Sequence, residues 1–221
     1  MSSPPQRPSV TADPRDRDLV RLHWPAELRP AFDALLDIDE AMADVLARAT
    51  QPALAAIKLA WWRERLEELD QQPPPAEPRL QAAARELLPR GLSGAALSSL
   101  EESWALLLME DQQAAFMRGV ALRGTRLFEL AVRLLGITMN DRLQNSAQCF
   151  SAADLGRRAI IDLVPLKRGK SQDRVPRRER PLTMFEALAR RDMRSGGPPF
   201  EPEATPWRAW TLFGHRLTGR L

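Results

Sequence analysis

The sequence predicts an all-α protein, and three observations support this fold class. Apolar residues recur at helical spacing along nearly the whole chain, and the alternating β-branched runs typical of strands are absent. Alanine, leucine, arginine and glutamate dominate, and these residues favour helices. Proline-rich segments separate the periodic stretches. With 221 residues and 44% hydrophobic content, the chain is expected to bury one core and to form a single domain.

The first two helices are predicted from apolar periodicity and proline placement. One should start near Pro30, with Phe32 among the residues of its apolar side. Pro52 suits the first turn of the second, which should run through Leu66. The segment 71–78 contains too many prolines for a helix, so we expect a loop there.

Cap residues predict the helices in the middle of the chain. A short helix is expected over residues 79–88, and Ser93 is a suitable N-cap for a helix that continues through Leu108. A long helix over residues 112–135 should end at Gly136, because glycine suits the left-handed conformation that follows many helices.

The remaining elements are predicted in the same way. Asp141 is expected to cap a helix, and residues 164–180 form a basic stretch that we interpret as a loop. Pro181 should open the next helix, and residues 196–199 should end it. The pair Thr205-Pro206 indicates an N-cap and a first helical position for the last helix.

The N-terminal segment and the apolar stretches predict the location of the protein. Residues 1–18 carry proline and charge where a secretory signal has an apolar core, so we expect a disordered leader followed by a domain over residues 19–221. Every apolar stretch is interrupted well before the roughly 18 residues that a membrane span requires. The expected location is therefore the cytoplasm.

Cysteine and histidine usage limits the kinds of metal site. Cys149 is the only cysteine, which excludes an intramolecular disulfide and a thiolate zinc site. His23 and His215 are the only histidines and lie far apart in sequence. Any metal would therefore be a hard cation, such as Mg²⁺, held by carboxylates.

The charge distribution is uneven along the chain. Residues 167–221 contain 13 Lys and Arg but six Asp and Glu. Such a basic region can attract diphosphates, anionic lipid headgroups or nucleic acid, although an arginine-rich solvated surface is the simpler interpretation. The most basic part, residues 167–180, has no aromatic residue on which a base could stack, so no nucleic-acid partner is expected.

One segment closely resembles a known family. Residues Gln51–Leu66 read QPALAAIKLAWWRERL, which is similar to a helix of squalene/phytoene synthase-like proteins that reads roughly EPxLxxIRLxWWRexL. Residues 124–136, 181–192 and 213–220 resemble further segments of that family, the last two in its short alphaproteobacterial branch. The resemblance touches most of residues 16–220.

The resemblance implies the isoprenoid-synthase fold, a helical bundle with a central cavity. Active members join two prenyl diphosphates head to head in isoprenoid biosynthesis, and two aspartate-rich helices hold the Mg²⁺ that neutralises the diphosphate leaving group. Another branch, similar to a mitochondrial complex I assembly factor, is thought to act without catalysis. The helix with Trp61 and Trp62 is more similar to that branch. One of these indoles is expected in the core and the other at a cavity wall or subunit contact, unless both have a packing role alone.

The acidic residues that the family chemistry needs are sparse. Asp33, Asp37, Glu40 and Asp44 lie on one predicted helical face, and the first three are the metal candidates, unless the stripe is merely a solvated face. Residues 148–155 resemble the second motif but retain one carboxylate, Asp154. The candidates for diphosphate binding are the cationic residues Arg63, Lys167 and Arg168. The alternative for Arg63 is an ion pair with Glu67, four residues later on the same helix.

The sequence therefore favours a degenerate, non-catalytic member of the squalene/phytoene synthase family over an enzyme. Its expected partners are a prenyl diphosphate or another isoprenoid lipid, or a membrane complex whose assembly it assists, with peripheral contact to the inner membrane. The alternative is an active Mg²⁺-dependent head-to-head prenyltransferase.

Overall fold

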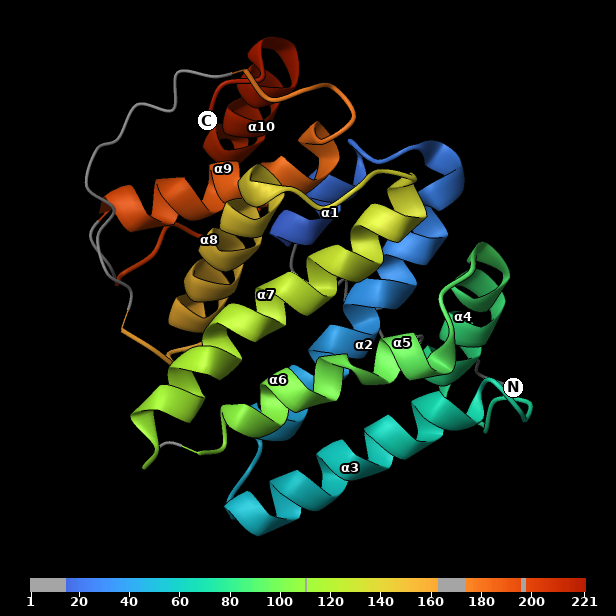
Figure 1. The fold of residues 1–221 in the computed structure, drawn as a ribbon. Coiled ribbons are helices and arrows are strands. Elements are labelled where there is room, and N and C mark those ends of the chain that lie inside the picture. Colours follow the sequence, from blue (N-terminus) through green and yellow to red (C-terminus); the bar gives the residue numbers. More distant parts are fainter. Residues whose placement is uncertain (1–14, 110, 163–173, 196–197) are drawn as a thin grey trace, which may run out of the picture.

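The computed structural model describes residues 15–109, 111–162, 174–195 and 198–221. Every regular element within these residues is a helix, which confirms the all-α prediction (Figure 1). The described helices are α1 (Asp16–Arg21), α2 (Arg29–Ala47), α3 (Pro52–Glu68), α4 (Pro78–Glu86), α5 (Gly94–Ser98), α6 (Leu100–Leu106), α7 (Gln113–Leu135), α8 (Asp141–Arg157), α9 (Arg180–Ser195) and α10 (Pro206–Thr218), with 3₁₀ turns at Ala26–Leu28 and Leu88–Arg90.

The helices pack largely in chain order. In Figure 1, α3 lies along one side, α5 and α6 lie against it, and α7, α8, α9 and α10 follow in turn across the molecule. Helix α2 packs against α3, α4, α6 and α7, and α1 contacts α2, α9 and α10. The N-terminal α1 and the C-terminal α10 therefore meet on one side of the bundle.

Several predicted helix ends are confirmed at the level of single residues. The Ser93 hydroxyl accepts a hydrogen bond from the Ala96 amide at 3.1 Å, and the Thr205 hydroxyl accepts one from the Arg208 amide at 3.3 Å. Gly136 follows α7 with φ 63°, the left-handed conformation that glycine adopts without a steric penalty.

Three predicted boundaries need correction. Helix α1 begins at Asp16, so the last residues of the expected leader are helical, whereas residues 1–14 lie outside the described residues. The helix predicted to run from Ser93 through Leu108 is divided into α5 and α6. Asn140, rather than Asp141, is the N-cap of α8, because its side chain accepts the Leu143 amide at 3.0 Å.

The core extends through the bundle, with buried apolar residues from α2 to α9 in one cluster. Helix α2 buries Phe32, Leu35, Ile38 and Met42 on its inner side. Gly124 of α7 faces the backbone of α8, and a Cβ atom at this position would collide with a carbonyl group there. This glycine allows α7 and α8 to approach closely, which brings charged side chains of the two helices within contact distance.

The two tryptophans of α3 have different environments, as predicted for adjacent helical residues. The side chain of Trp62 is buried in the core, with 7% of its surface exposed, whereas Trp61 is 42% exposed. The indole rings meet edge to face with centroids 5.2 Å apart. Trp62 therefore contributes to the core, and Trp61 leaves apolar surface on the outside of α3.

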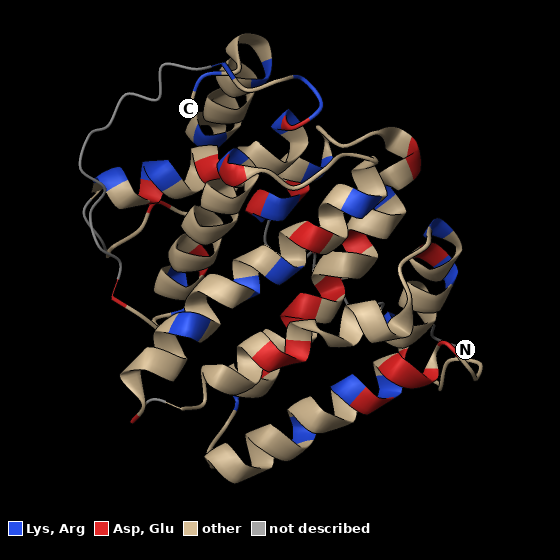
Figure 2. Cartoon of the chain, viewed as in Figure 1, with Lys and Arg blue, Asp and Glu red and all other residues tan. Residues whose placement is uncertain are grey.

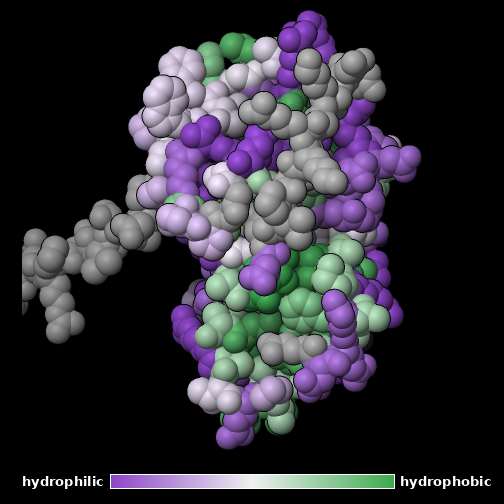
Figure 3. All heavy atoms as spheres, turned by 90° about the vertical axis from the view of Figure 1, so that its left-hand side faces the viewer, coloured by the Kyte–Doolittle hydropathy of each residue, from purple (hydrophilic) through white to green (hydrophobic). Residues whose placement is uncertain are grey.

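The surface of the protein is apolar in several places. Figure 3 shows one face whose lower half gathers hydrophobic side chains while its upper half is mostly hydrophilic. The ends of α6 and α7, at the lower left of Figure 1, lie on that side. None of the described helices is both long enough and apolar enough to cross a membrane. The exposed large hydrophobic residues are Leu22, Leu54, Ile57, Trp61, Met109, Met117, Trp207, Trp210, Phe213 and Leu217.

Candidate functional site

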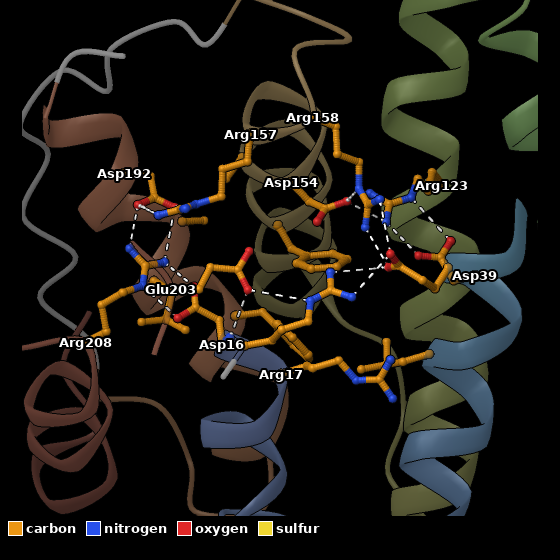
Figure 4. A pocket seen from close by; sticks show the side chains of 18 residues that line it. Asp16, Arg17, Asp39, Arg123, Asp154, Arg157, Arg158, Asp192, Glu203 and Arg208 are labelled. Atoms are coloured by element: carbon orange, nitrogen blue, oxygen red, sulfur yellow. Dashed lines mark hydrogen bonds and ion pairs between the residues drawn. The ribbon is translucent and has the colours of Figure 1, made fainter. Parts of the chain in front are cut away.

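A small pocket lies between α1, α2, α7, α8, α9 and α10 (Figure 4). Its volume is about 80 Å³, well below the ~300–1,000 Å³ of typical ligand pockets. One part of the wall is apolar and includes Leu36, Phe150, Phe185 and Leu188. The remainder is charged, with six arginines and six carboxylates, so the pocket has no formal net charge.

The first group of charges surrounds Arg123 of α7. Its side chain is 1% exposed, and its guanidinium contacts carboxylates from two other helices. Nη2 lies 2.6 Å from Asp39 Oδ2 of α2 and 2.8 Å from Asp154 Oδ2 of α8. The indole Nε1 of Trp104 donates a hydrogen bond to Asp39 Oδ1 at 2.9 Å, and the guanidinium carbon lies 4.5 Å from the centroid of the same indole. Arg123 therefore bridges the acidic groups of α2 and α8.

Arg158, at the end of α8, extends this group to the pocket rim. Its Nε donates to Asp154 Oδ2 at 2.8 Å, and its Nη2 donates to Glu40 Oε2 at 2.7 Å. Because Glu40 lies on α2, Arg158 forms a second bridge between α2 and α8. We call Asp39, Glu40, Arg123, Asp154 and Arg158 the Arg123 cluster.

A second group of charges surrounds Arg208 of α10, whose side chain is also 1% exposed. Its Nε donates to Asp16 Oδ1 of α1 at 2.8 Å, and its Nη1 donates to Asp192 Oδ1 of α9 at 2.6 Å. Arg157 of α8 also binds Asp192 with two hydrogen bonds of 2.7 Å. These four residues, Asp16, Arg157, Asp192 and Arg208, are the Arg208 cluster.

Arg15 connects the two clusters across the pocket. Its Nη1 lies 3.2 Å from Glu40 Oε1 of the Arg123 cluster, and its Nε lies 3.8 Å from Glu203 Oε2. Glu203 in turn accepts a hydrogen bond from the Asp16 amide of the Arg208 cluster at 3.0 Å. Figure 4 shows the two clusters on opposite sides of the pocket. The network thus joins helices from both ends of the sequence.

The arginines lower the pKa values of three acids that line the pocket, Asp154, Asp192 and Glu40. Burial by itself would raise the pKa of Asp154, but the charges of Arg123 and Arg158 outweigh burial and hold it below the usual 3.8. At Asp192, the hydrogen bonds and charges of Arg157 and Arg208 outweigh burial and lower the pKa. At Glu40, those of Arg158 and Arg15 do the same. All three pKa values are therefore lower than the ordinary values of these groups.

These shifts predict that acid destabilises the protein. A carboxyl group whose pKa is lowered on folding stabilises the folded state above its unfolded pKa, here 3.8 for Asp and 4.5 for Glu. This contribution is lost as the pH falls through the lower folded values. We expect the free energy of unfolding, measured by urea titration, to decrease steadily below these unfolded pKa values. A free energy that stays constant down to about pH 3 would contradict the proposed pairing.

Two of the residues proposed from the sequence as metal candidates line the pocket. Glu40 and Asp154 face each other from α2 and α8 and share Arg158. Asp33 and Asp37 do not line it. Asp33 pairs with Arg21 at 2.6 Å, and Asp37 pairs with Arg17 at 2.8 Å. Among the residues that the structure describes, no three acidic, histidine or cysteine side chains converge as a metal site.

The proposed diphosphate-binding residues are not brought together at the pocket. Arg63 lies on the outer part of α3 and is 45% exposed, 3.8 Å from Glu101 rather than paired with Glu67. Lys167 and Arg168 lie outside the described residues. The cationic groups at the pocket come instead from α1, α7, α8 and α10.

Sequence reasoning missed Asp39, Arg123, Asp192 and Arg208, although Asp39 and Arg123 had a recognisable signal. Asp39 stands on the apolar side of its helix, three or four residues from the buried Leu35, Leu36, Met42 and Ala43. Arg123 is flanked in the same way by Gly119, Val120 and Leu127. A single charge within an apolar helical stripe indicates a buried ion pair, because a charge is seldom buried without a partner.

No protein-family model, curated protein or solved structure matches this chain.

Proposed function

We propose that this protein is a degenerate member of the squalene/phytoene synthase family, with an isoprenoid-synthase-type helical fold, that acts as a non-catalytic binding or assembly protein. Two features of the segments that resemble the family motifs support the family: Gln51–Leu66 provides the N-cap and most of helix α3, and Gly124 lies at the contact between α7 and α8. The all-helical architecture is compatible with that fold.

The observation that carries the non-catalytic proposal is the position of Arg123. In active members, Mg²⁺ ions held by two acidic helices neutralise the diphosphate. Here the acidic groups of α2 and α8 are already neutralised by a guanidinium that is fixed to the protein. A metal bound between Asp39 and Asp154 would have to displace Arg123, which would leave a buried cation without a partner.

The other carboxylates of the pocket do not fit Mg²⁺ either. Glu40 is engaged by Arg158 and Arg15, and Asp192 is engaged by Arg157 and Arg208. Mg²⁺ retains several water ligands and requires carboxylate oxygens that are free to coordinate it. The side chains of the pocket therefore disagree with the metal chemistry of the active family.

The pocket volume also favours an assembly role over a role in carrying a prenyl lipid inside the bundle. A cavity of about 80 Å³ cannot enclose a prenyl diphosphate without separation of the surrounding helices. The ion pairs that join α1, α2, α8, α9 and α10 oppose such a separation. We therefore infer that the partner binds to the outside of the protein.

One observation favours the alternative of an active prenyltransferase. Glu40 and Asp154 face the same pocket from two helices, which is the general arrangement that the family chemistry needs. An opening of the ion-pair network would be required before these residues could bind metal.

The proposal predicts that the purified protein releases no pyrophosphate. We expect the signal with Mg²⁺ and farnesyl or geranylgeranyl diphosphate to equal that of a control without protein, because the pocket lacks free carboxylates and space. The measurement is an enzyme-coupled pyrophosphate assay calibrated with added pyrophosphate. Release that disappears in Glu40→Gln, but persists in the exposed control Glu102→Gln, would establish the enzyme instead.

A further inference from the structure

Helix α10 exposes an apolar stripe that the described residues do not cover. Trp207, Trp210, Phe213 and Leu217 are 68%, 64%, 47% and 65% exposed. Their spacing of three and four residues places them on one side of the helix. Trp210 and Phe213 meet edge to face with ring centroids 5.5 Å apart, and both line a shallow depression. We call these four residues the α10 stripe.

The orientation of α10 is fixed by its opposite side. Arg208, Leu212 and His215 are buried there, and Arg208 is bonded to Asp16 and Asp192. The α10 stripe therefore cannot turn inward without breaking the Arg208 cluster. An exposed group of two indoles, a phenyl ring and a leucine on one helix indicates an interaction surface.

A cationic groove continues directly from the stripe. Leu217, at the end of the stripe, lines this groove together with His23, Arg177, Arg180 and Arg216, and no carboxylate lines it. Within the described part of the chain, these arginines form no ion pair with Asp or Glu, unlike the arginines of the pocket. Burial and the neighbouring Arg216 lower the pKa of His23, so the arginines provide the charge of the groove at neutral pH.

Charge and side-chain type together identify the partner. Helix α10 contains basic residues but no Asp or Glu (Figure 2). Tryptophan and phenylalanine beside arginine are typical of helices that lie in the headgroup region of a bilayer, where the rings enter the acyl boundary and the cations meet anionic lipids. We propose that the α10 stripe and its arginine groove dock this protein on the surface of an anionic phospholipid bilayer. This inference names a surface for the peripheral membrane contact expected from the sequence, and it rests on the exposure and charge of α10 rather than on the family proposal.

The exposed apolar residues of α3 provide a comparison within the same protein. Leu54, Ile57 and Trp61 are exposed, but the same helix carries three acidic residues beside three basic ones and has no net charge, whereas α10 has no acidic residue. The charged residues are Lys58, Arg63, Glu64, Arg65, Glu67 and Glu68. A helix without net charge gains little from anionic headgroups. The α3 surface therefore serves as a control of similar hydrophobicity and different charge.

The test is co-sedimentation of the full chain with vesicles of phosphatidylcholine alone and of phosphatidylcholine mixed with phosphatidylglycerol. We expect binding to the anionic vesicles, weaker binding at high salt, and a blue shift of tryptophan emission. Because each arginine near an anionic surface changes partitioning by about fivefold, Arg177→Gln/Arg216→Gln should bind about 25-fold more weakly. The exposed pair Arg48→Gln/Arg118→Gln should change binding much less.

The apolar part is tested by Trp207→Ala/Trp210→Ala, which should lose at least about tenfold in binding. Both side chains are exposed, so circular dichroism should report a folded protein. The matched variant Ile57→Ala/Trp61→Ala should retain binding. Equal binding to neutral and anionic vesicles would overturn the proposal, and so would no binding to either.

Two further results would also overturn the assignment. Binding that survives the α10 changes but disappears in Lys167→Gln/Arg168→Gln/Lys170→Gln would transfer the contact to another segment. A dimer in light scattering that depends on Trp207 and Trp210 would make the stripe a contact between two copies of this chain. Neither result bears on pyrophosphate release, so the two proposals fail separately.

Discussion

Replacing Arg123 by methionine is expected to lower the free energy of unfolding by about 3–5 kcal/mol. The substitution retains much of the side-chain volume but removes the cation that contacts both Asp39 and Asp154. The carboxylate of Asp39, on a side chain that is 4% exposed, would then keep only the Trp104 indole as a polar partner in the described structure. Urea denaturation at neutral pH measures the loss.

A second arginine on the same helix provides the control. Arg118 pairs with Glu102 at 3.0 Å, but the two side chains are 68% and 46% exposed. Its replacement by methionine should change the stability by less than about 1 kcal/mol, since water screens exposed pairs. If both variants unfold at the same urea concentration, the Arg123 bridge does not stabilise the fold.

A double variant separates the lost ion pairs from the lost packing. Adding Asp39→Asn to Arg123→Met removes one of the unpaired charges and retains a side-chain oxygen that can accept from Trp104. We expect the double variant to be more stable than Arg123→Met alone. If the loss of unfolding free energy in the double variant equals the sum of the losses in Arg123→Met alone and Asp39→Asn alone, the two residues act independently.

Replacing Arg208 by methionine is expected to cost about 3 kcal/mol, the lower end of the range for a broken buried pair, because Asp192 retains Arg157. Arg208 binds Asp16 of α1 and Asp192 of α9 from α10. Its loss should therefore loosen the place where the two ends of the chain meet. Amide hydrogen exchange should rise in α1 and α10 and remain slow in α7.

The control for Arg208 lies next to Asp192 on α9. Arg191 pairs with Glu201, and the two side chains are 37% and 26% exposed. Arg191→Met should lose less than about 1 kcal/mol and leave exchange in α1 unchanged. Equal exchange in the Arg191 and Arg208 variants would show that the Arg208 cluster does not hold α1 in place.

Local rules determined most of the helices. Pro52, Ser93, Gly136 and the pair Thr205-Pro206 marked helix ends correctly, because capping depends on residues that are close in sequence. The division between α5 and α6 was not predicted, since the apolar periodicity runs across it. The packing partners change at that break: α5 packs against α3, whereas α6 packs against both α3 and α7.

The candidate site was predicted only in part. Glu40 and Asp154 were proposed and line the pocket, but their arginine partners were not foreseen. Arg158 and Glu40 are 118 residues apart, and Arg208 and Asp16 are 192 apart. No local pattern relates residues at such separations.

The sequence by itself determined that the chain is helical, where most helices end, and which carboxylates these helices carry. The tertiary structure alone decided which of these carboxylates are neutralised, and by which arginines. Helix formation depends on residues within a few positions of one another. Neutralisation depends on which helix faces meet, and the close approach of α7 and α8 at Gly124 helps bring Arg123 between Asp39 and Asp154.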